Sequence, residues 1–194
     1  MVNCSPNWLP TSQVGLGSDP DGKPMHEAWS YSSIVGMLLY LTTNTRPDIA
    51  FAISQVARFN HAPKQSHAAA VKMIVRYLVC TADYGMTFSP TGQLDIECYV
   101  DADFAGLYCL ELDASPNSVC SRTSYIIKLG NCLLLWKSQL QSKIPLSTLE
   151  AENSALSHCL RMLLPLRVLL IELANGLSLP ANITLSIKCT VFVK

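Results

Sequence analysis

The spacing of the hydrophobic residues first changes between residues 80 and 94, and this change limits the folds that the chain can adopt. Upstream of it, apolar side chains recur at the intervals of an amphipathic helix. Downstream of it, polar residues alternate with Leu94, Ile96, Cys98 and Val100, which is the period of a strand with one buried face. Helices followed by strands, another helix and a last strand predict an α+β fold with a mixed sheet.

Three helices are expected in the first part of the chain. The first follows Ser30, a residue type suited to the cap position, and ends near residue 41. The second begins at Thr45-Arg46-Pro47-Asp48, because a cap residue, an early proline and an acid in the first turn favour a helix start, and it ends near Phe59. The third covers about residues 65–79, and its apolar face consists of Ala69, Met73, Ile74, Tyr77 and Leu78.

Strands are expected over residues 84–88 and 94–101. A hairpin is expected where residues 124–129 and 132–137 flank Gly130-Asn131, a two-residue turn signal. A helix should begin at Ser147, bend or break at Pro165 and end at Asn175-Gly176. Residues 183–193 alternate as a last strand.

These elements suggest three parts. Residues 1–28 are rich in Pro, Gly, Ser and Asp and are expected to form an extended leader or linker. Residues 29–90 form a helical segment, and residues 91–194 form the domain that contains the sheet. A hydrophobic content of 49% with only 14% charged residues argues against disorder.

The compartment is indicated by the cysteines and the N-terminus. The eight cysteines include no C-x-x-C pair, and no basic region followed by an apolar run opens the chain. We therefore expect reduced, mostly buried cysteines in an intracellular protein, cytoplasmic or nuclear, that is not secreted. The apolar stretch of residues 159–173 is interrupted by Arg161, Pro165, Arg167 and Glu172, so we expect a core helix and no membrane partner.

Two acidic sites could carry chemistry. Asp101 and Asp103 lie at the end of a predicted strand, where carboxylates can hold a hard divalent ion, although a solvated strand end is the simpler interpretation. Glu150 and Glu152 lie in the first turns of a predicted helix, where acids also simply complement the helix dipole. The four histidines show no metal-binding spacing, and no Gly-x-Ser-x-Gly motif occurs.

Several runs resemble one family in the right order. Residues 31–52, YSSIVGMLLYLTTNTRPDIAFA, resemble the segment after the reverse transcriptase palm in copia-type LTR retrotransposon Pol polyproteins. The similarity continues through Arg58-Phe59, His67 and Arg76-Tyr77-Leu78. The runs 99–106 (YVDADFAG), 121–125 (SRTSY) and 146–152 (LSTLEAE) resemble the ribonuclease H segment of the same polyproteins.

The resemblance implies a short helical unit followed by a ribonuclease H-like mixed β-sheet with helices. The family hydrolyses the RNA strand of an RNA-DNA hybrid with two Mg²⁺ ions about 3.5–4 Å apart, one activating water and the other stabilising the leaving oxygen. By resemblance, Asp101 is the first catalytic aspartate and Glu152 the catalytic glutamate. Both would be ligands of Mg²⁺, with Mn²⁺ as a substitute, and the partner would be the hybrid or another nucleic acid.

The departures from the family point to an inactive, truncated domain. Lys194 stands where the third aspartate is expected, and an ammonium group there would repel Mg²⁺. Asn153 occupies a position that is usually aromatic. We therefore expect no hybrid cleavage and at most weak binding of a single ion. The alternatives are a noncatalytic module that binds nucleic acid or protein, and a pseudogene product without function; nothing in the sequence indicates the oligomeric state.

The net charge of zero conceals a separation of charge along the chain. Residues 46–80 carry five basic residues against Asp48 alone, and residues 121–194 carry eight basic residues against three acids. Residues 93–120 carry six acids and no Lys or Arg. A basic helical segment and a basic tail beside an acidic strand end are compatible with a surface that follows phosphates next to a metal site.

Overall fold

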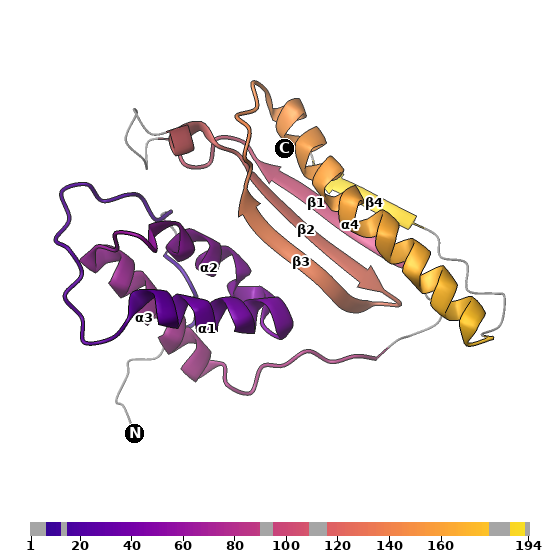
Figure 1. Ribbon diagram of the computed structural model, residues 1–194, viewed down its shortest axis with the longest axis horizontal. Coiled ribbons are helices and arrows are strands. Elements are labelled where there is room, and N and C mark those ends of the chain that lie inside the picture. Colours follow the sequence, from indigo (N-terminus) through magenta and orange to yellow (C-terminus); the bar gives the residue numbers. More distant parts are fainter. Residues whose placement is uncertain (1–6, 13–14, 90–94, 109–115, 179–186, 193–194) are drawn as a thin grey trace. The chain divides into compact units, whose positions relative to one another are not determined.

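The computed structural model describes residues 7–12, 15–89, 95–108, 116–178 and 187–192 (Figure 1). The described residues form two compact units. The helical unit comprises those up to Met86 together with those of 107–118, and the sheet unit comprises those of 87–106 and 119–194. The division predicted from the sequence, with boundaries after residues 28 and 90, stays a prediction.

The helical unit contains the three expected helical segments. Helix α1 spans Tyr31–Asn44 and begins as predicted, because the Ser30 hydroxyl accepts a hydrogen bond from the backbone N–H of Ser33. The second segment is not one α-helix but consists of the 3₁₀ turn η1 (Pro47–Ile49), helix α2 (Ala50–Val56) and the 3₁₀ turn η2 (Ala57–Phe59). Its first turn is preceded by Arg46 and not by the predicted cap, Thr45. Helix α3 spans Gln65–Cys80.

The three helices enclose an apolar core, but the buried face of α3 differs from the predicted one. Tyr77 and Ile74 are buried as expected, whereas Ala69 is exposed and Met73 and Leu78 are only half-buried. The helix instead buries His67, Ala68 and Val71. The helical period of α3 was therefore predicted correctly, but the face predicted to be buried was not, because the helix packs against α1 and α2 with a slightly different side. The core consists of Tyr31, Val35, Leu38, Ile49, Ala52, Ile53, Val56, Val71, Ile74 and Tyr77.

The described residues before α1 pack against this core. Leu16 and Met25 contact it, and the backbone around Pro24 pairs antiparallel with that around Lys64. His67 is completely buried, and its Nδ1 accepts a hydrogen bond from the backbone N–H of Lys64 at 3.0 Å. Its Nε2 therefore carries the proton and donates to the carbonyl oxygen of Gly17 at 3.0 Å. His67 is thus a core residue that fixes the preceding segment to α3.

The sheet unit is α+β, as predicted. Its strands are β1 (Ile96–Asp103), β2 (Arg122–Leu129), β3 (Cys132–Leu140) and β4 (Ile187–Phe192), and they are arranged in the order β3-β2-β1-β4. The 3₁₀ turn η3 (Pro116–Val119) precedes β2. Strands β1, β2 and β3 are antiparallel neighbours, and β4 pairs parallel to β1. The sheet is therefore mixed.

Two local predictions for the sheet have opposite outcomes. The hairpin between β2 and β3 is confirmed, with Gly130 and Asn131 both at positive φ, as a tight turn requires. The strand predicted at residues 84–88 is wrong, because these residues have no strand partner and Tyr84 and Phe88 are each 61% exposed. Alternation alone does not make a strand where no neighbour supplies hydrogen bonds.

Helix α4 spans Thr148–Gly176 and lies along one face of the sheet (Figure 1). The Ser147 hydroxyl accepts from the backbone N–H of Glu150 at 3.2 Å and caps the helix, as predicted. The predicted break at Pro165 is wrong, since a single helix continues through it. Leu163 and Leu166, on either side of Pro165, both pack against the sheet, and this packing offsets the backbone hydrogen bond that proline cannot make.

The second half of α4 is not the predicted core helix. The whole of α4, with 29 residues, extends about 44 Å, whereas a strand of eight or nine residues spans about 30 Å. The helix therefore projects past the sheet. In this half the exposed apolar residues are Leu164, Val168, Leu169, Ile171 and Leu173. By length and composition alone α4 could also cross a membrane, and it is the only described helix of which this is true.

Candidate functional site

The carboxylate of Asp101 lies near the C-terminal end of β1, on the sheet face that α4 does not cover. Val100 and Ala102 belong to the core that β1 forms with α4, and successive side chains of a strand point to opposite faces. Asp101 pairs in register with Ser124 of β2 and Phe192 of β4. Its Oδ1 is buried and has no hydrogen-bond partner among the described residues. An acceptor in this state is available to a cation or a donor group.

The carboxylate of Glu152 lies in the second turn of α4 and is 4% exposed. The adjacent Ala151, and Ala155 one turn later, pack against the sheet, so Glu152 lies at the margin of the buried stripe of the helix. Glu150 is exposed, and its Oε2 accepts a hydrogen bond from the backbone N–H of Leu146 at 2.7 Å. Glu150 thus binds the backbone just before the N-cap of α4, and the simpler role expected from the sequence, complementing the helix dipole, stays a prediction.

Both candidate residues lie at the same end of the sheet but on elements that meet different faces. Gln141, directly after β3, donates from Nε2 to the carbonyl oxygen of Ala151 at 2.9 Å and to Thr123 Oγ1 at 3.1 Å. Thr123 pairs with Ala102, next to Asp101. The start of α4 is therefore tied to the end of β1, yet Asp101 points to the open face while Glu152 belongs to the helix on the covered face.

Asp103 is exposed at the end of β1, and its carboxylate lies over Gly106 in the following turn. A side chain added at Gly106 would displace this carboxylate. In the same turn Ala105 has a positive φ, and its backbone N–H donates to Ser121 Oγ at 3.2 Å. The run from Asp101 to Gly106 therefore contains a tight turn as well as its two carboxylates.

The described residues alone do not provide the ligands of a centre with two metal ions. Within the described part of the chain no group of three or more His, Cys, Asp or Glu side chains is placed to hold a metal ion. Asp101 lies on the face of β1 that α4 does not cover and Glu152 lies on α4, so these two carboxylates provide few ligands for two Mg²⁺ ions. Lys194, the residue expected at the third aspartate position, lies outside the described residues.

The basic residues of the helical unit are largely engaged in internal contacts, which the sequence did not reveal. Arg46 is buried and donates to both carboxylate oxygens of Asp48, to the carbonyl oxygen of Thr81 at 3.0 Å and to its hydroxyl at 2.6 Å. The Tyr77 hydroxyl donates to Asp48 Oδ2 at 2.8 Å. Lys72 forms an ion pair of 2.6 Å with Glu27. The expected basic surface on these helices is therefore much weaker than the residue count suggested.

Burial opposes ionisation of Asp48, but the hydrogen bonds from Arg46 and Tyr77 outweigh it and lower the pKa of its carboxyl. Through hydrogen bonds to Thr81 and Tyr77, Arg46 and Asp48 thus connect the start of the second helical segment to the end of α3. The only sequence signal of this connection was an arginine and an aspartate two residues apart.

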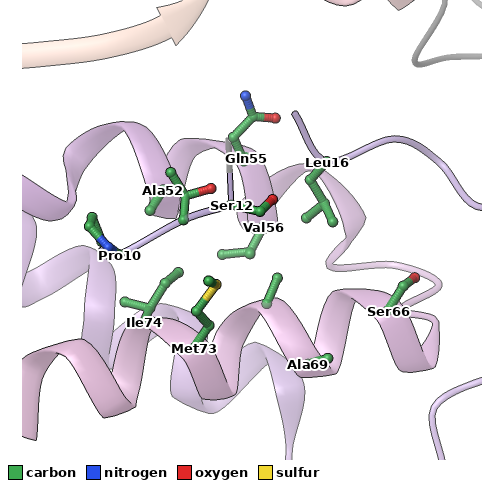
Figure 2. A pocket seen from close by; sticks show the side chains of 12 residues that line it. Pro10, Ser12, Leu16, Ala52, Gln55, Val56, Ser66, Ala69, Met73 and Ile74 are labelled. Atoms are coloured by element: carbon green, nitrogen blue, oxygen red, sulfur yellow. The ribbon is translucent and has the colours of Figure 1, made fainter. Parts of the chain in front are cut away.

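A small cavity of about 210 Å³ lies in the helical unit, between residues 10–12 with Leu16 on one side and helices α2 and α3 on the other (Figure 2). Figure 2 shows Ala52 and Val56 of α2 opposite Met73 and Ile74 of α3, with Leu16 closing one side. No ionisable side chain is found among its described lining residues. The cavity therefore offers apolar contact but no acid, base or metal ligand.

Curated proteins that resemble this chain include transposon polyproteins. The chain is 31% identical over 180 residues to the retrovirus-related Pol polyprotein from transposon RE1 of Arabidopsis thaliana, covering 93% of the chain and 12% of that protein. It is 39% identical over 125 residues to the retrovirus-related Pol polyprotein from transposon TNT 1-94 of Nicotiana tabacum, covering 64% of the chain and 9% of that protein. It is also 36% identical over 127 residues to the secreted RxLR effector protein 161 of Plasmopara viticola, covering 66% of the chain and 84% of that protein.

No family model and no solved structure matches the chain. The chain spans about a tenth of the length of the Pol polyproteins that it resembles. The similarity to the RE1 polyprotein nevertheless covers nearly the whole chain, including the helical unit and the sheet unit, as the resemblance of the ordered motifs predicted. The chain therefore belongs to the copia-type, retrovirus-related Pol polyproteins from transposons.

Proposed function

We propose that the sheet unit is the first part of a ribonuclease H-like domain of such a polyprotein, that the helical unit is the segment linking it to the reverse transcriptase, and that this chain does not cleave RNA-DNA hybrids. The observation that carries the proposal is the mixed sheet with Asp101 at the end of its strand β1 and Glu152 at the start of α4, at the same end of the sheet. This arrangement agrees with the fold and the acidic motifs that the resemblance implies.

Two features of the sheet unit support inactivity. Asp101 lies on the sheet face that α4 does not cover, Glu152 lies on α4, and no third acidic, histidine or cysteine ligand joins them in the described part of the chain. Phosphodiester hydrolysis by two metal ions needs charge balance and fixed geometry at both ions. Asp101, with its buried and unpartnered Oδ1, could at most contribute to binding a single divalent ion.

The test is a cleavage assay of the 194-residue chain on a labelled RNA-DNA hybrid, with Mg²⁺ and with Mn²⁺. The variant Asp101→Asn removes the charge of the candidate ligand, and Asp103→Asn is the matched control on the same strand. We expect no cleavage by the wild-type chain above that of Asp101→Asn. Turnover that Asp101→Asn abolishes and Asp103→Asn retains would overturn the proposed inactivity and establish the ribonuclease site.

The resemblance to the ribonuclease H fold has its own test, which does not depend on activity. An experimental structure of the chain should show strand β4 parallel to β1 and helix α4 on one face of the sheet. A sheet in which residues 187–192 do not pair with residues 96–101 would contradict the proposed domain, whatever the cleavage assay gives.

A further inference from the structure

A polar groove of about 550 Å³ lies in the sheet unit, between β3 and the N-terminal half of α4. Strand β3 and the residues after it form one wall, and α4 forms the other. Leu140 is the one apolar residue among its described lining residues. Lys143 lines it from the strand side, and Asn153, Ser154, Ser157 and Arg161 line it from the helix. Neither Asp101 nor Glu152 belongs to this groove.

The charge of the groove favours an anion. Its cationic side chains are Lys143 and Arg161, and no hydrogen bond or ion pair within the described part of the chain engages either of them. The carboxylate that lines the groove, Glu150, already accepts the backbone N–H of Leu146 at 2.7 Å. The groove thus contains two cationic side chains that are not engaged by the described residues, and one carboxylate that already accepts a backbone hydrogen bond.

His158, which lines the groove from α4, adds a donor group that has no acceptor among the described residues. Burial and then the charges of Lys137 and Arg161 lower the pKa of His158, so the ring is neutral near pH 7. The Gln139 amide nitrogen lies 2.9 Å from Nε2 and donates to it, which places the ring proton on Nδ1. That Nδ1 is buried and has no hydrogen-bond partner among the described residues. The wall therefore holds donor groups in excess of acceptors.

We infer that this groove binds a phosphate group, with Lys143 and Arg161 neutralising its charge and the side chains of Asn153, Ser154 and Ser157 donating hydrogen bonds. A guanidinium and an ammonium on facing walls suit the several acceptor oxygens of a phosphate, and charge-assisted hydrogen bonds are stronger than neutral ones. The phosphate can belong to a free mononucleotide or to the backbone of a nucleic-acid strand. This inference goes beyond the proposed function, because it requires neither a metal ion nor hybrid cleavage.

The test is a binding titration of the 194-residue chain with inorganic phosphate, adenosine monophosphate and a short oligothymidylate, followed by nuclear magnetic resonance. We expect Arg161→Gln and Lys143→Gln each to weaken the binding about tenfold, as the loss of one charge-assisted contact predicts. The matched control is Arg167→Gln, which removes the same charge from an exposed position of α4 outside the groove and should leave affinity unchanged.

The outcomes distinguish a specific phosphate site in the groove from nonspecific electrostatic attraction to the positive charges of the chain. Equal weakening by Arg161→Gln and Arg167→Gln, or no binding of any of the three probes, would overturn the inference. Variant-sensitive binding of adenosine monophosphate identifies a free nucleotide as a sufficient ligand, and binding of the oligothymidylate alone identifies the strand backbone. Ser157→Ala, which keeps the charge and removes a hydroxyl at an exposed position, should weaken binding by a smaller factor and guards against misfolding of the charge variants.

Discussion

The helical unit and the sheet unit differ in the hydrogen bonding of their buried polar atoms and in the exposure of their apolar side chains. In the helical unit the central ionisable residues Arg46, Asp48 and His67 all have hydrogen-bond partners. In the sheet unit Asp101 and His158 each keep a buried polar atom without a partner among the described residues, and half of α4 exposes apolar side chains. Buried polar atoms are normally satisfied, so the exceptions indicate where a ligand or partner is needed. The helical unit also has such an atom, the Ser18 hydroxyl oxygen, but in the sheet unit they include a carboxylate oxygen of Asp101 and a ring nitrogen of His158, so function should be sought there first.

The largest expected effect separates the buried face of α4 from its exposed face. Leu163 is completely buried in the sheet core, whereas the adjacent Leu164 is 51% exposed. Leu163→Ala should lower the free energy of unfolding of the sheet unit by about 3 kcal/mol, because it leaves a cavity. Leu164→Ala, the matched control, should change it by less than about 0.5 kcal/mol. Urea denaturation in a background with Trp8→Phe and Trp29→Phe, in which Trp136 in β3 is the remaining tryptophan, measures both, and a large cost for Leu164→Ala would show that the projecting half of α4 is covered after all.

The next effect concerns the contacts of Arg46 with Asp48 and Thr81 in the helical unit. Arg46→Met removes the guanidinium from Asp48 and Thr81 and leaves the Asp48 carboxylate without an opposite charge, although the Tyr77 hydroxyl still donates to it, so it should destabilise the helical unit by about 2 kcal/mol. Arg76→Met, at an exposed position of α3, is the control and should have little effect. Hydrogen exchange resolved to peptides should show faster exchange in α1 and α3 and no change in β2 and β3. Equal loss of protection in both units would mean that the two units do not unfold separately.

Local features of the fold could be predicted from the sequence because their causes are local. The caps at Ser30 and Ser147 and the Gly130-Asn131 turn each depend on a few neighbouring residues. The alternation in β1 predicted its buried face correctly, since Ile96, Cys98 and Val100 are all in the core. The false strand at residues 84–88 shows the limit, because a strand also needs a partner that the local pattern does not contain.

The candidate site could be predicted in part only. Asp101 and Glu152 were found through motifs, but the face on which each lies depends on how α4 crosses the sheet, which is set by contacts between distant residues. The basic character expected of the helical unit came from counting residues. The count could not reveal that Lys72 pairs with Glu27, 45 residues earlier, or that Arg46 is buried beside Asp48. The groove at Lys143 and Arg161 likewise joins residues from two elements that no local motif connects.

The smallest expected effect is a dependence of the free energy of unfolding of the helical unit on pH. The pKa of Asp48 is lowered in the folded helical unit, because the hydrogen bonds from Arg46 and Tyr77 outweigh the cost of burial. A lowered pKa contributes stability that is complete above the ordinary value of 3.8 and is lost as the pH falls below it. The free energy of unfolding of the helical unit should therefore decrease as the pH falls from about 5 to about 3, and Asp48→Asn should flatten this decrease.

Asp21→Asn removes a carboxylate from an exposed position of the same unit, and it should leave the slope with pH as it is in the wild-type chain. Urea denaturation at each pH, monitored by hydrogen exchange of α1 and α3, measures the slope for all three proteins. If Asp48→Asn keeps the wild-type slope, the carboxylate is not held ionised by Arg46 and Tyr77. The helical unit would then, like the sheet unit, contain a carboxylate whose partner lies elsewhere, and the contrast between the two units would rest on their apolar surfaces alone.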